Sequence, residues 1–344
     1  MNARLTRLAE RLDESLLVTE PTNVVYLTGF ASSNAALLVE RDRVRLFTDF
    51  RYWGAAQTVE NVEPVQTKRD LVGELARLLS GRIAFERSLS YGSYERLRDG
   101  GLDLVPTSGL VESLRAVKDE DELELLRRAC AITDRVFERL TEVRFVGRRE
   151  RDVAWDLQSL FHEEGGDGLA FESIVGSGPT GSRPHARAGD RTIGEGELVV
   201  IDAGCTVQGY ASDYTRTFAT GDLDGEMREA YDTVLAAQQA ALDGIRAGLP
   251  GVEADALARQ VIDGSAFKDA MGHGLGHGLG LDVHELPRMS TESSDMLEPG
   301  NVVTVEPGVY LDGRFGIRIE DDVVVTENGI DNLTGFRNDL VTVS

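Results

Sequence analysis

The sequence predicts an α+β protein of two domains, and three observations support this prediction. At 344 residues the chain is longer than one hydrophobic core usually organises. In its second half, helical patterns come in blocks and strand-like runs meet in hairpins, which favours α+β over a parallel wound sheet. A highly charged segment, VESLRAVKDEDE, interrupts the apolar pattern around residues 112–120. We therefore expect one domain over residues 1–117 and another over 118–344.

The first domain is expected to be a small α/β unit, because short apolar runs alternate with polar helical stretches. The expected strands are LLVT (16–19), VVYL (24–27), AALLVE (35–40), VRLFTD (44–49) and RIAFE (82–86). The expected helices are RYWGAAQ (51–57) and LVGELARLL (71–79).

The second domain opens with a long charged helix from about Asp119 to Glu142. Its apolar residues recur at helical spacing and share one face. These residues are Leu123, Leu126, Ala129, Ile132, Val136 and Leu140. Three more helices are expected, near residues 149–164, 224–247 and 253–263, together with strands that end in acidic residues.

Composition excludes several classes of partner. A formal net charge of −23 argues against binding to nucleic acid or to an anionic membrane. No window approaches the roughly 18 apolar residues of a membrane span, and the start of the chain lacks the apolar core of a secretory signal. Two cysteines, Cys130 and Cys205, suit a reducing cytoplasm. The acidic, lysine-poor surface is typical of a salt-rich cytoplasm, or simply of an acidic proteome.

Three of the five histidines lie in one glycine-rich stretch, GHGLGHGLGLDVHE (272–285). His273 and His277 have the spacing of two ligands on one helical face, but five glycines make a helix unfavourable here. An extended path fits better, with glycine allowing another segment or a ligand to approach the backbone. A flexible loop with incidental histidines is the alternative that this stretch alone leaves open.

Four acidic residues fall in or beside apolar runs that are expected to be buried. Asp202 ends LVVID, and Asp213 follows eleven residues later in YASDYTRTF, across a glycine-containing turn typical of a hairpin. Glu306 interrupts NVVTVEPGVY, and Glu320 closes FGIRIE. Because side chains two apart share a face of a strand, each acid except Asp202 gains a polar neighbour. The expected pairings are Asp213 with Thr215 and Thr217, Glu306 with Thr304, and Glu320 with Arg318, while Val303, Val305, Ile317 and Ile319 point the other way.

Buried carboxylates are costly unless a cation is shared between them. Four of them carry about −4, which two divalent ions would offset at about +4. A neutral imidazole from the glycine-rich stretch would complete the ligands, and oxygen donors with one nitrogen favour Mn²⁺, with Co²⁺, Fe²⁺ or Zn²⁺ as alternatives. Pairing with arginines, or exposure at strand ends, is the competing explanation for any single acid. Asp321 and Asp322 are expected to be such solvated acids.

In combination, these motifs resemble the pita-bread metallopeptidases, the superfamily of Xaa-Pro aminopeptidase, prolidase, methionine aminopeptidase and the metal-free creatinase. The matching segments are IDAG followed by SDYTRTF, GHGLGHGLGLDVHELP, VVTVEPGVY and FGIRIEDDVVVT, in this order. TNVVYLTGFASSNAALLVERDRVRLFTDFRY resembles the creatinase-type N-terminal domain, and PTGSRPHARAGDR resembles the segment that bears a catalytic histidine. The resemblance covers the whole chain and implies a pita-bread domain in its second half.

The resemblance also implies roles for individual residues. Asp202 matches a ligand of one metal, Asp213 and Glu320 match bridging carboxylates, and His277 and Glu306 match ligands of the other metal. His185 and His284 match histidines that contact the substrate and stabilise the oxyanion. His273 matches a histidine that lines the pocket, and Arg318 matches an arginine that braces the site or meets the substrate carboxylate. His162 is left over and is expected at the surface of a helix.

The implied activity is a dinuclear-metal hydrolase that cleaves the bond preceding proline in small peptides. A hydroxide between two cations would attack the carbonyl, with Glu306 as the candidate general base. The N-terminal segment favours an Xaa-Pro aminopeptidase over an Xaa-Pro dipeptidase, and methionine aminopeptidase fits less well. A hydrolase of non-peptide C–N bonds, such as a creatinase-like or compatible-solute enzyme, is an alternative, and a metal-free interaction module is the weakest one. The resemblance further implies a homodimer.

Overall fold

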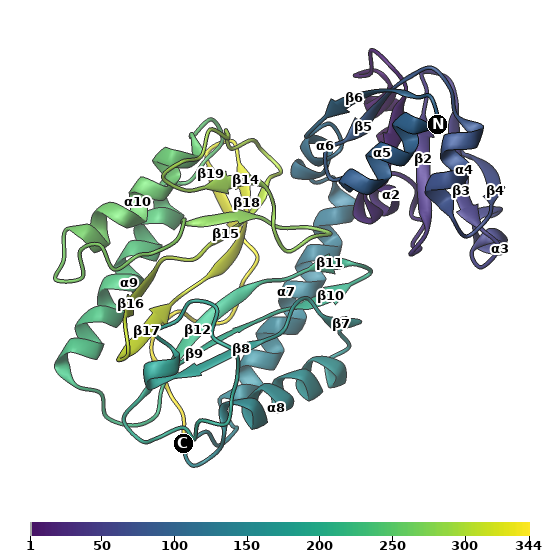
Figure 1. Ribbon diagram of the computed structural model, residues 1–344. Coiled ribbons are helices and arrows are strands. Elements are labelled where there is room, and N and C mark those ends of the chain that lie inside the picture. The colour runs from purple at the N-terminus through teal and green to yellow at the C-terminus, as the bar shows by residue number, and fades with distance from the viewer. Residues whose placement is uncertain (1) are drawn as a thin grey trace. The chain divides into compact units, whose positions relative to one another are not determined.

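The computed structural model describes residues 2–344, which divide into two compact units (Figure 1). The first unit ends at Arg115 and the second runs from Ala116 to Ser344. Within the described residues, no helix combines the length and the apolar character needed to cross a membrane.

The first unit is built on a mixed six-stranded sheet in the order β4-β3-β2-β1-β5-β6. Its strands are β1 (Leu16–Val18), β2 (Ala35–Val39), β3 (Val44–Asp49), β4 (Glu63–Thr67), β5 (Arg82–Glu86) and β6 (Asp103–Thr107). Its helices are α1 (Ala3–Ala9), α2 (Pro21–Thr28), α3 (Trp53–Ala56), α4 (Leu71–Leu78), α5 (Tyr91–Asp99) and α6 (Glu112–Ala116), the last of which reaches the first residue of the second unit. The central strands β1, β2 and β3 pair antiparallel, whereas the outer pairs β3–β4, β1–β5 and β5–β6 are parallel.

One expected strand of this unit is a helix. The run VVYL (24–27) lies inside α2, although its β-branched residues favour a strand. Proline at position 21 fits the first turn of a helix, and Gly29 ends the helix in the left-handed conformation with φ 71°. These two end signals outweigh the propensity of the residues between them, and Val24 and Leu27 are buried as helix residues. The other four expected strands of this unit are confirmed.

The second unit contains four long helices and fourteen strands within the described residues. Its helices are α7 (Glu120–Leu140), α8 (Glu150–Glu163), α9 (Gly225–Gly244) and α10 (Gly251–Asp263), with a 3₁₀ turn at Gly178–Thr180. Its strands are β7 (Gly168–Leu169), β8 (Ile174–Ser177), β9 (Leu198–Ala203), β10 (Cys205–Val207), β11 (Tyr210–Ala211), β12 (Tyr214–Ala219), β13 (Gly276–Gly278), β14 (Glu285–Met289), β15 (Val302–Val305), β16 (Gly308–Leu311), β17 (Phe315–Arg318), β18 (Asp321–Thr326), β19 (Gly329–Asn332) and β20 (Val341–Thr342). All four long helices lie where the sequence predicts them.

The strands of the second unit lie between two pairs of helices (Figure 1). Helices α7 and α8 pack on the four-stranded sheet β20-β12-β9-β8, through residues such as Phe137, Leu157 and Phe218. Helices α9 and α10 pack against the five-stranded sheet β14-β13-β15-β18-β19, where Val234 and Val303 belong to one buried cluster. An α/β first unit and a second unit of segregated helices and antiparallel strands confirm the predicted α+β class.

Candidate metal centre

The four predicted acids lie on two antiparallel strand pairs. Asp202 of β9 is opposite Thr215 of β12, which confirms the expected hairpin, and Asp213 immediately precedes β12. Glu306 directly follows β15, and Glu320 directly precedes β18, the partner of β15. The two pairs meet where the N–H of Glu320 donates to the carbonyl of Thr215 at 3.1 Å. This contact brings the acids of both sheets to one place.

The alternation of side chains along these strands is as predicted. Thr304 Oγ1 donates to Glu306 Oε1 at 3.2 Å, and Arg318 Nε is 3.8 Å from Glu320 Oε2. Thr215 Oγ1 also donates to Glu320 Oε2, at 2.6 Å. The intervening apolar residues Val303, Val305, Ile317 and Ile319 are fully buried in the core beneath α9 and α10. Each of these two strand acids therefore has a polar partner on its own face.

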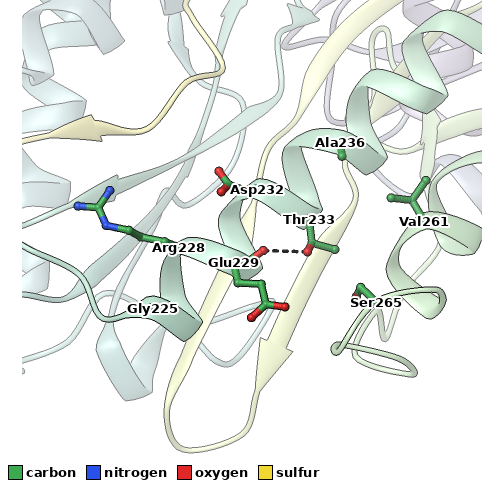
Figure 2. A pocket seen from close by; sticks show the side chains of 8 residues that line it. All are labelled: Gly225, Arg228, Glu229, Asp232, Thr233, Ala236, Val261 and Ser265. Carbon is green, nitrogen blue, oxygen red and sulfur yellow. Dashed lines mark hydrogen bonds between the residues drawn. The ribbon is translucent and has the colours of Figure 1, made fainter.

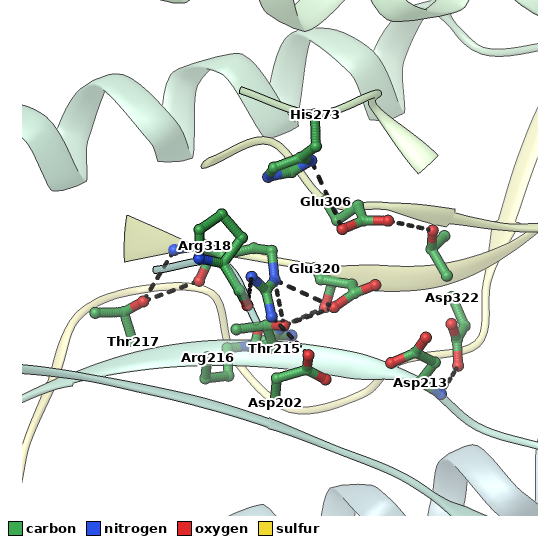
Figure 3. A network of polar contacts seen from close by, with 12 residues as sticks. Asp202, Asp213, Thr215, Arg216, Thr217, His273, Glu306, Arg318, Glu320 and Asp322 are labelled. Atoms are coloured by element: carbon green, nitrogen blue, oxygen red, sulfur yellow. Dashed lines mark hydrogen bonds and ion pairs between the residues drawn. The ribbon is translucent and has the colours of Figure 1, made fainter. Parts of the chain in front are cut away.

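Three side chains bring their potential ligand atoms within 4.8 Å of one another: Asp213, His277 and Glu320. His277 Nε2 is 3.9 Å from Asp213 Oδ2 and 3.4 Å from Glu306 Oε1. Asp202 reaches the same group through Arg318, whose guanidinium also faces Glu320 (Figure 3). Three of the five predicted ligands thus form one group, Glu306 lies next to it through His277, and Asp202 is linked to it through Arg318.

The tautomer of His277 is fixed by its backbone contact. Its Nδ1 is 3.1 Å from the carbonyl of Gly278, so Nδ1 carries the proton and Nε2 presents a lone pair. That lone pair faces the carboxylate oxygens of Asp213 and Glu306, which are acceptors as well. Acceptors that converge without a donor between them are what a cation requires, and this histidine arrangement is usual for a metal ligand.

Glycine brings the histidine strand into contact with its neighbours. A Cβ at Gly276 would collide with the carbonyl of Thr304, and one at Gly278 would collide with the carbonyl of Leu286. The two glycines flank His277 in β13, which lies between β14 and β15. The extended path predicted for this stretch is confirmed around His277, and the flexible-loop alternative is wrong there.

Burial and mutual repulsion perturb the carboxylates. The pKa values of Asp213 and Glu320 lie well above the ordinary range, first because both groups are desolvated and then because the neighbouring acids repel them. Burial likewise raises the pKa of Glu306. Asp213 is only 5% exposed and Glu320 only 2%, so water does little to screen this repulsion. The site favours added positive charge.

These raised pKa values predict how the stability of the metal-free protein depends on pH. A group whose folded pKa is raised stabilises the fold below its unfolded pKa and loses that contribution as pH rises through the folded value. We expect the Tm of EDTA-treated protein to fall as the pH rises above the ordinary carboxylate range, and Mn²⁺ to suppress the fall. Glu320→Gln removes one titrating group and should flatten the profile. Identical pH profiles with and without Mn²⁺ would count against this electrostatic account.

The donor set fits a divalent metal. Asp202 Oδ1 is buried and has no hydrogen-bond partner within the described part of the chain, while its Oδ2 accepts from Arg318 at 2.6 Å. A buried carboxylate oxygen without a donor carries a desolvation cost that a bound cation removes. Oxygen donors with one imidazole nitrogen suit first-row divalent ions.

The buried guanidinium of Arg318 contacts several residues around the carboxylate cluster. It is 4% exposed, and its nitrogens contact Asp202, Thr215, the carbonyl of Pro184 and the hydroxyl of Tyr310. The sequence left two roles open for Arg318. Because these protein groups already occupy its guanidinium, a role in holding the site residues in place is favoured over contact with a substrate carboxylate.

Tyr310 joins Arg318 to His273, and sequence reasoning did not single it out. His273 Nδ1 lies 2.8 Å from the carbonyl of Gly274, so Nδ1 donates and Nε2 accepts from the Tyr310 hydroxyl at 3.0 Å. That hydroxyl in turn accepts from Arg318 at 2.8 Å. The sequence offered one signal for Tyr310. It lies in the run GVY, on the strand β16 that pairs with β17, and β17 bears Arg318.

The two histidines expected to contact substrate are exposed, unlike the ligands. The ring of His284 lies 4.3 Å from that of His277, centroid to centroid. Partial burial lowers the pKa of His284, and its neighbours His277 and His185 lower it further, because several imidazolium charges side by side would repel one another. His185 is therefore within electrostatic range of His284, on a segment whose Pro184 carbonyl contacts Arg318. His162 is exposed on α8, as predicted.

The expectation that Asp321 and Asp322 are solvated is wrong. They are 1% and 0% exposed, because β18 is an interior strand between β15 and β19. Asp321 pairs with the buried guanidinium of Arg216 at 2.7 Å. Asp322 instead accepts the backbone N–H of Asp213.

A hollow of about 600 Å³ lies elsewhere, along α9 and the end of α10 (Figure 2). Its lining includes Arg228, Glu229, Asp232 and Thr233 on one face of α9. None of the predicted site residues lines it. We therefore place the candidate site at the carboxylate cluster.

The fold and the carboxylate–imidazole cluster define the class of metal-dependent hydrolases. Two family models match the chain: "Metallopeptidase family M24" over residues 124–327 and "Creatinase/Prolidase N-terminal domain" over residues 3–117. The chain therefore belongs to metallopeptidase family M24, and the resemblance inferred from its motifs is confirmed.

Several relatives match this chain over nearly their full length. An Xaa-Pro dipeptidase of Pyrococcus furiosus is 33% identical over 350 residues, which cover 99% of this chain and 100% of the relative. The solved structure of an Xaa-Pro dipeptidase from Bacillus anthracis is 35% identical with a TM-score of 0.95, covering 99% of both chains. The crystal structure of an X-Pro aminopeptidase from Thermotoga maritima is 34% identical with a TM-score of 0.88, covering 97% of this chain and 99% of that one.

Proposed function

We propose that this protein is an Xaa-Pro dipeptidase, which hydrolyses the bond preceding proline in dipeptides. The observation that carries the hydrolytic centre is the Nε2 of His277, which faces the carboxylates of Asp213 and Glu306 while Nδ1 contacts a backbone carbonyl. The relatives named Xaa-Pro dipeptidase support the dipeptide specificity. Sequence reasoning favoured the aminopeptidase, and the Thermotoga maritima structure keeps that activity as the second candidate.

In this proposal the five converging side chains would hold two divalent ions, for which we propose Mn²⁺. Asp213 and Glu320 would bridge both ions, Asp202 would bind one, and His277 and Glu306 would bind the other. Such ions supply Lewis-acid polarisation of the substrate and lower the pKa of water.

The chain's own residues would then move the protons. Glu306, whose pKa is raised by burial, would take a proton from the attacking water and return it to the proline nitrogen as the C–N bond breaks. His284 and His185 would donate hydrogen bonds to the carbonyl oxygen as it gains charge. Proline has no N–H and restricts the residue before it, so the pocket must be shaped for this bond.

A panel of peptides tests the proposal. Ala-Pro, Ala-Pro-Ala and longer peptides would be incubated with Mn²⁺, Co²⁺ or Zn²⁺ at low and high salt. A dipeptidase cleaves Ala-Pro and leaves the longer peptides intact. Faster cleavage of Ala-Pro-Ala would assign the aminopeptidase, and turnover of a non-peptide C–N substrate alone would assign the hydrolase alternative.

Arg288 is the candidate for recognising the dipeptide carboxylate, because Arg318 is occupied by the protein. Arg288 lies directly opposite His277 in the β13–β14 pair, so the two side chains share a face. It is exposed, and its charge adds to the burial that lowers the pKa of His277.

We expect Arg288→Ala to raise KM for Ala-Pro by about 10–100-fold, since a hydrogen bond to a charged group contributes about 1.5–3 kcal/mol. For Ala-Pro-amide, which lacks the carboxylate, the same substitution should change KM much less. Arg246→Ala, at an exposed arginine after α9, is the matched control. An equal rise in KM for Ala-Pro and for its amide would refute this role of Arg288.

The proposal also covers the oligomeric state of the enzyme and the salt content of its surroundings. We infer a homodimer in a salt-rich cytoplasm, from the family resemblance and from the net charge of −23. Sedimentation of the full chain should give the mass of two copies, and the peptide panel at high salt should show retained activity. A monomer that loses activity as salt rises would contradict both inferences.

A further inference from the structure

Asp322 is fully buried beside the proposed metal centre, although it belongs to none of the proposed ligand positions. It is the second residue of β18, and its Oδ2 accepts the backbone N–H of Asp213 at 3.0 Å (Figure 3). Asp213 lies in the break between β11 and β12, where strand pairing does not hold its N–H. One carboxylate therefore fixes the main chain of a proposed bridging ligand across the two sheets.

Two side chains of helix α7 contact Asp322 and Ser212, the residue that precedes Asp213. Cys130 Sγ is 3.4 Å from the Asp322 oxygen that binds Asp213, and its thiol donates to it. One turn further along, Thr133 Oγ1 is 2.7 Å from Ser212 Oγ. Ser212 Oγ also accepts the N–H of Cys205 at 3.1 Å. Two buried side chains of α7 thus tie down the consecutive residues Ser212 and Asp213.

We propose that Asp322, supported by Cys130 and Thr133, is a positioning residue that sets the place of Asp213 in the metal centre. The inference rests on the proposed function, because it takes Asp213 as a metal ligand. Ligand distances in metal sites are held to within about 0.2 Å, so a ligand in a break between strands needs a separate restraint. The N–H that Asp322 holds belongs to the ligand residue itself, so movement of this contact moves the carboxylate.

A merely structural role and a positioning role predict different results. Many buried carboxylates hold backbone N–H groups, and their loss lowers stability wherever they lie. Glu150 is such a group: it is 1% exposed and accepts the N–H of Ser177 at 2.9 Å, away from the proposed ligands. Only a positioning residue changes the affinity for the ion as well.

The experiment is a calorimetric titration of Mn²⁺ into EDTA-treated full-length protein, with Tm measured alongside. Asp322→Ala should weaken Mn²⁺ binding by about 10–100-fold, the usual effect of losing a partner behind the ligands. Asp322→Asn keeps an oxygen acceptor and should restore affinity to within about threefold of the wild type. Glu150→Ala should lower Tm and leave Mn²⁺ affinity unchanged.

Wild-type affinity in Asp322→Ala, with or without a lower Tm, would overturn the inference. If the wild type itself binds no Mn²⁺, the proposed metal centre fails, which is a separate result. If Asp322→Ala does not fold, the double variant Cys130→Ala/Thr133→Val tests the same restraint from α7. It should weaken Mn²⁺ binding by more than about threefold, in line with the loss of outer contacts, and unchanged binding would overturn the inference.

Discussion

Asp213→Ala is expected to abolish metal-dependent turnover while the chain remains folded. The substitution removes a carboxylate that lies 3.9 Å from His277 Nε2 and belongs to the three-residue cluster with Glu320. Because Asp213 is a proposed bridging ligand, the loss of kcat/KM should exceed the roughly 10–100-fold that an outer partner costs. The measurement is the initial rate on Ala-Pro with saturating Mn²⁺.

The fold should survive because alanine keeps the backbone N–H that Asp322 accepts. Removing one of several mutually repelling carboxylates should leave the Tm of the metal-free protein at neutral pH equal to or above that of the wild type. Asp222→Ala, at an exposed acid shortly after β12, should retain wild-type activity. Substantial turnover by Asp213→Ala would refute the bridging assignment.

His284→Ala is expected to lower kcat by about 10²–10³-fold, the usual cost of losing one donor to an oxyanion, without changing the metal content. The His284 side chain is exposed next to the ring of His277 and stands outside the ligand cluster. It can therefore face a substrate while His277 serves as the proposed metal ligand.

The contrast between two histidines makes this measurement specific. Elemental analysis of His284→Ala should give the metal content of the wild type, whereas His277→Ala should lose metal and activity together. His162→Ala, on the exposed side of α8, should match the wild type in both. Loss of metal from His284→Ala would show that its role is that of a ligand.

Sequence patterns predicted the helices of the second unit well because each is long and amphipathic. Helix α7 begins with a capping box between Asp119 and Glu122, a local signal that the sequence shows directly. Short elements were harder. The run VVYL became part of α2, and strands β4 and β6 went unpredicted because β4 contains Pro64 and β6 contains Pro106, which weaken a strand pattern.

At the site, alternation along strands predicted the faces of Glu306 and Glu320, because that alternation is a local property. The grouping of Asp213, His277 and Glu320 was expected from charge compensation and from family resemblance. Contacts between elements that are distant in the sequence could not be predicted in this way. The Tyr310 link and the burial of Asp322 depend on how the two sheets and α7 meet, which no spacing in the sequence encodes.

The central claim is that two divalent ions make it favourable for Asp202, Asp213, Glu306 and Glu320 to converge beside His277. Anomalous diffraction from crystals grown with Mn²⁺ tests it most directly. We predict two peaks about 3.5–4 Å apart, the usual separation in two-metal sites, with the carboxylates of Asp213 and Glu320 between them. A fully active crystal form with no peak among these five side chains would contradict it.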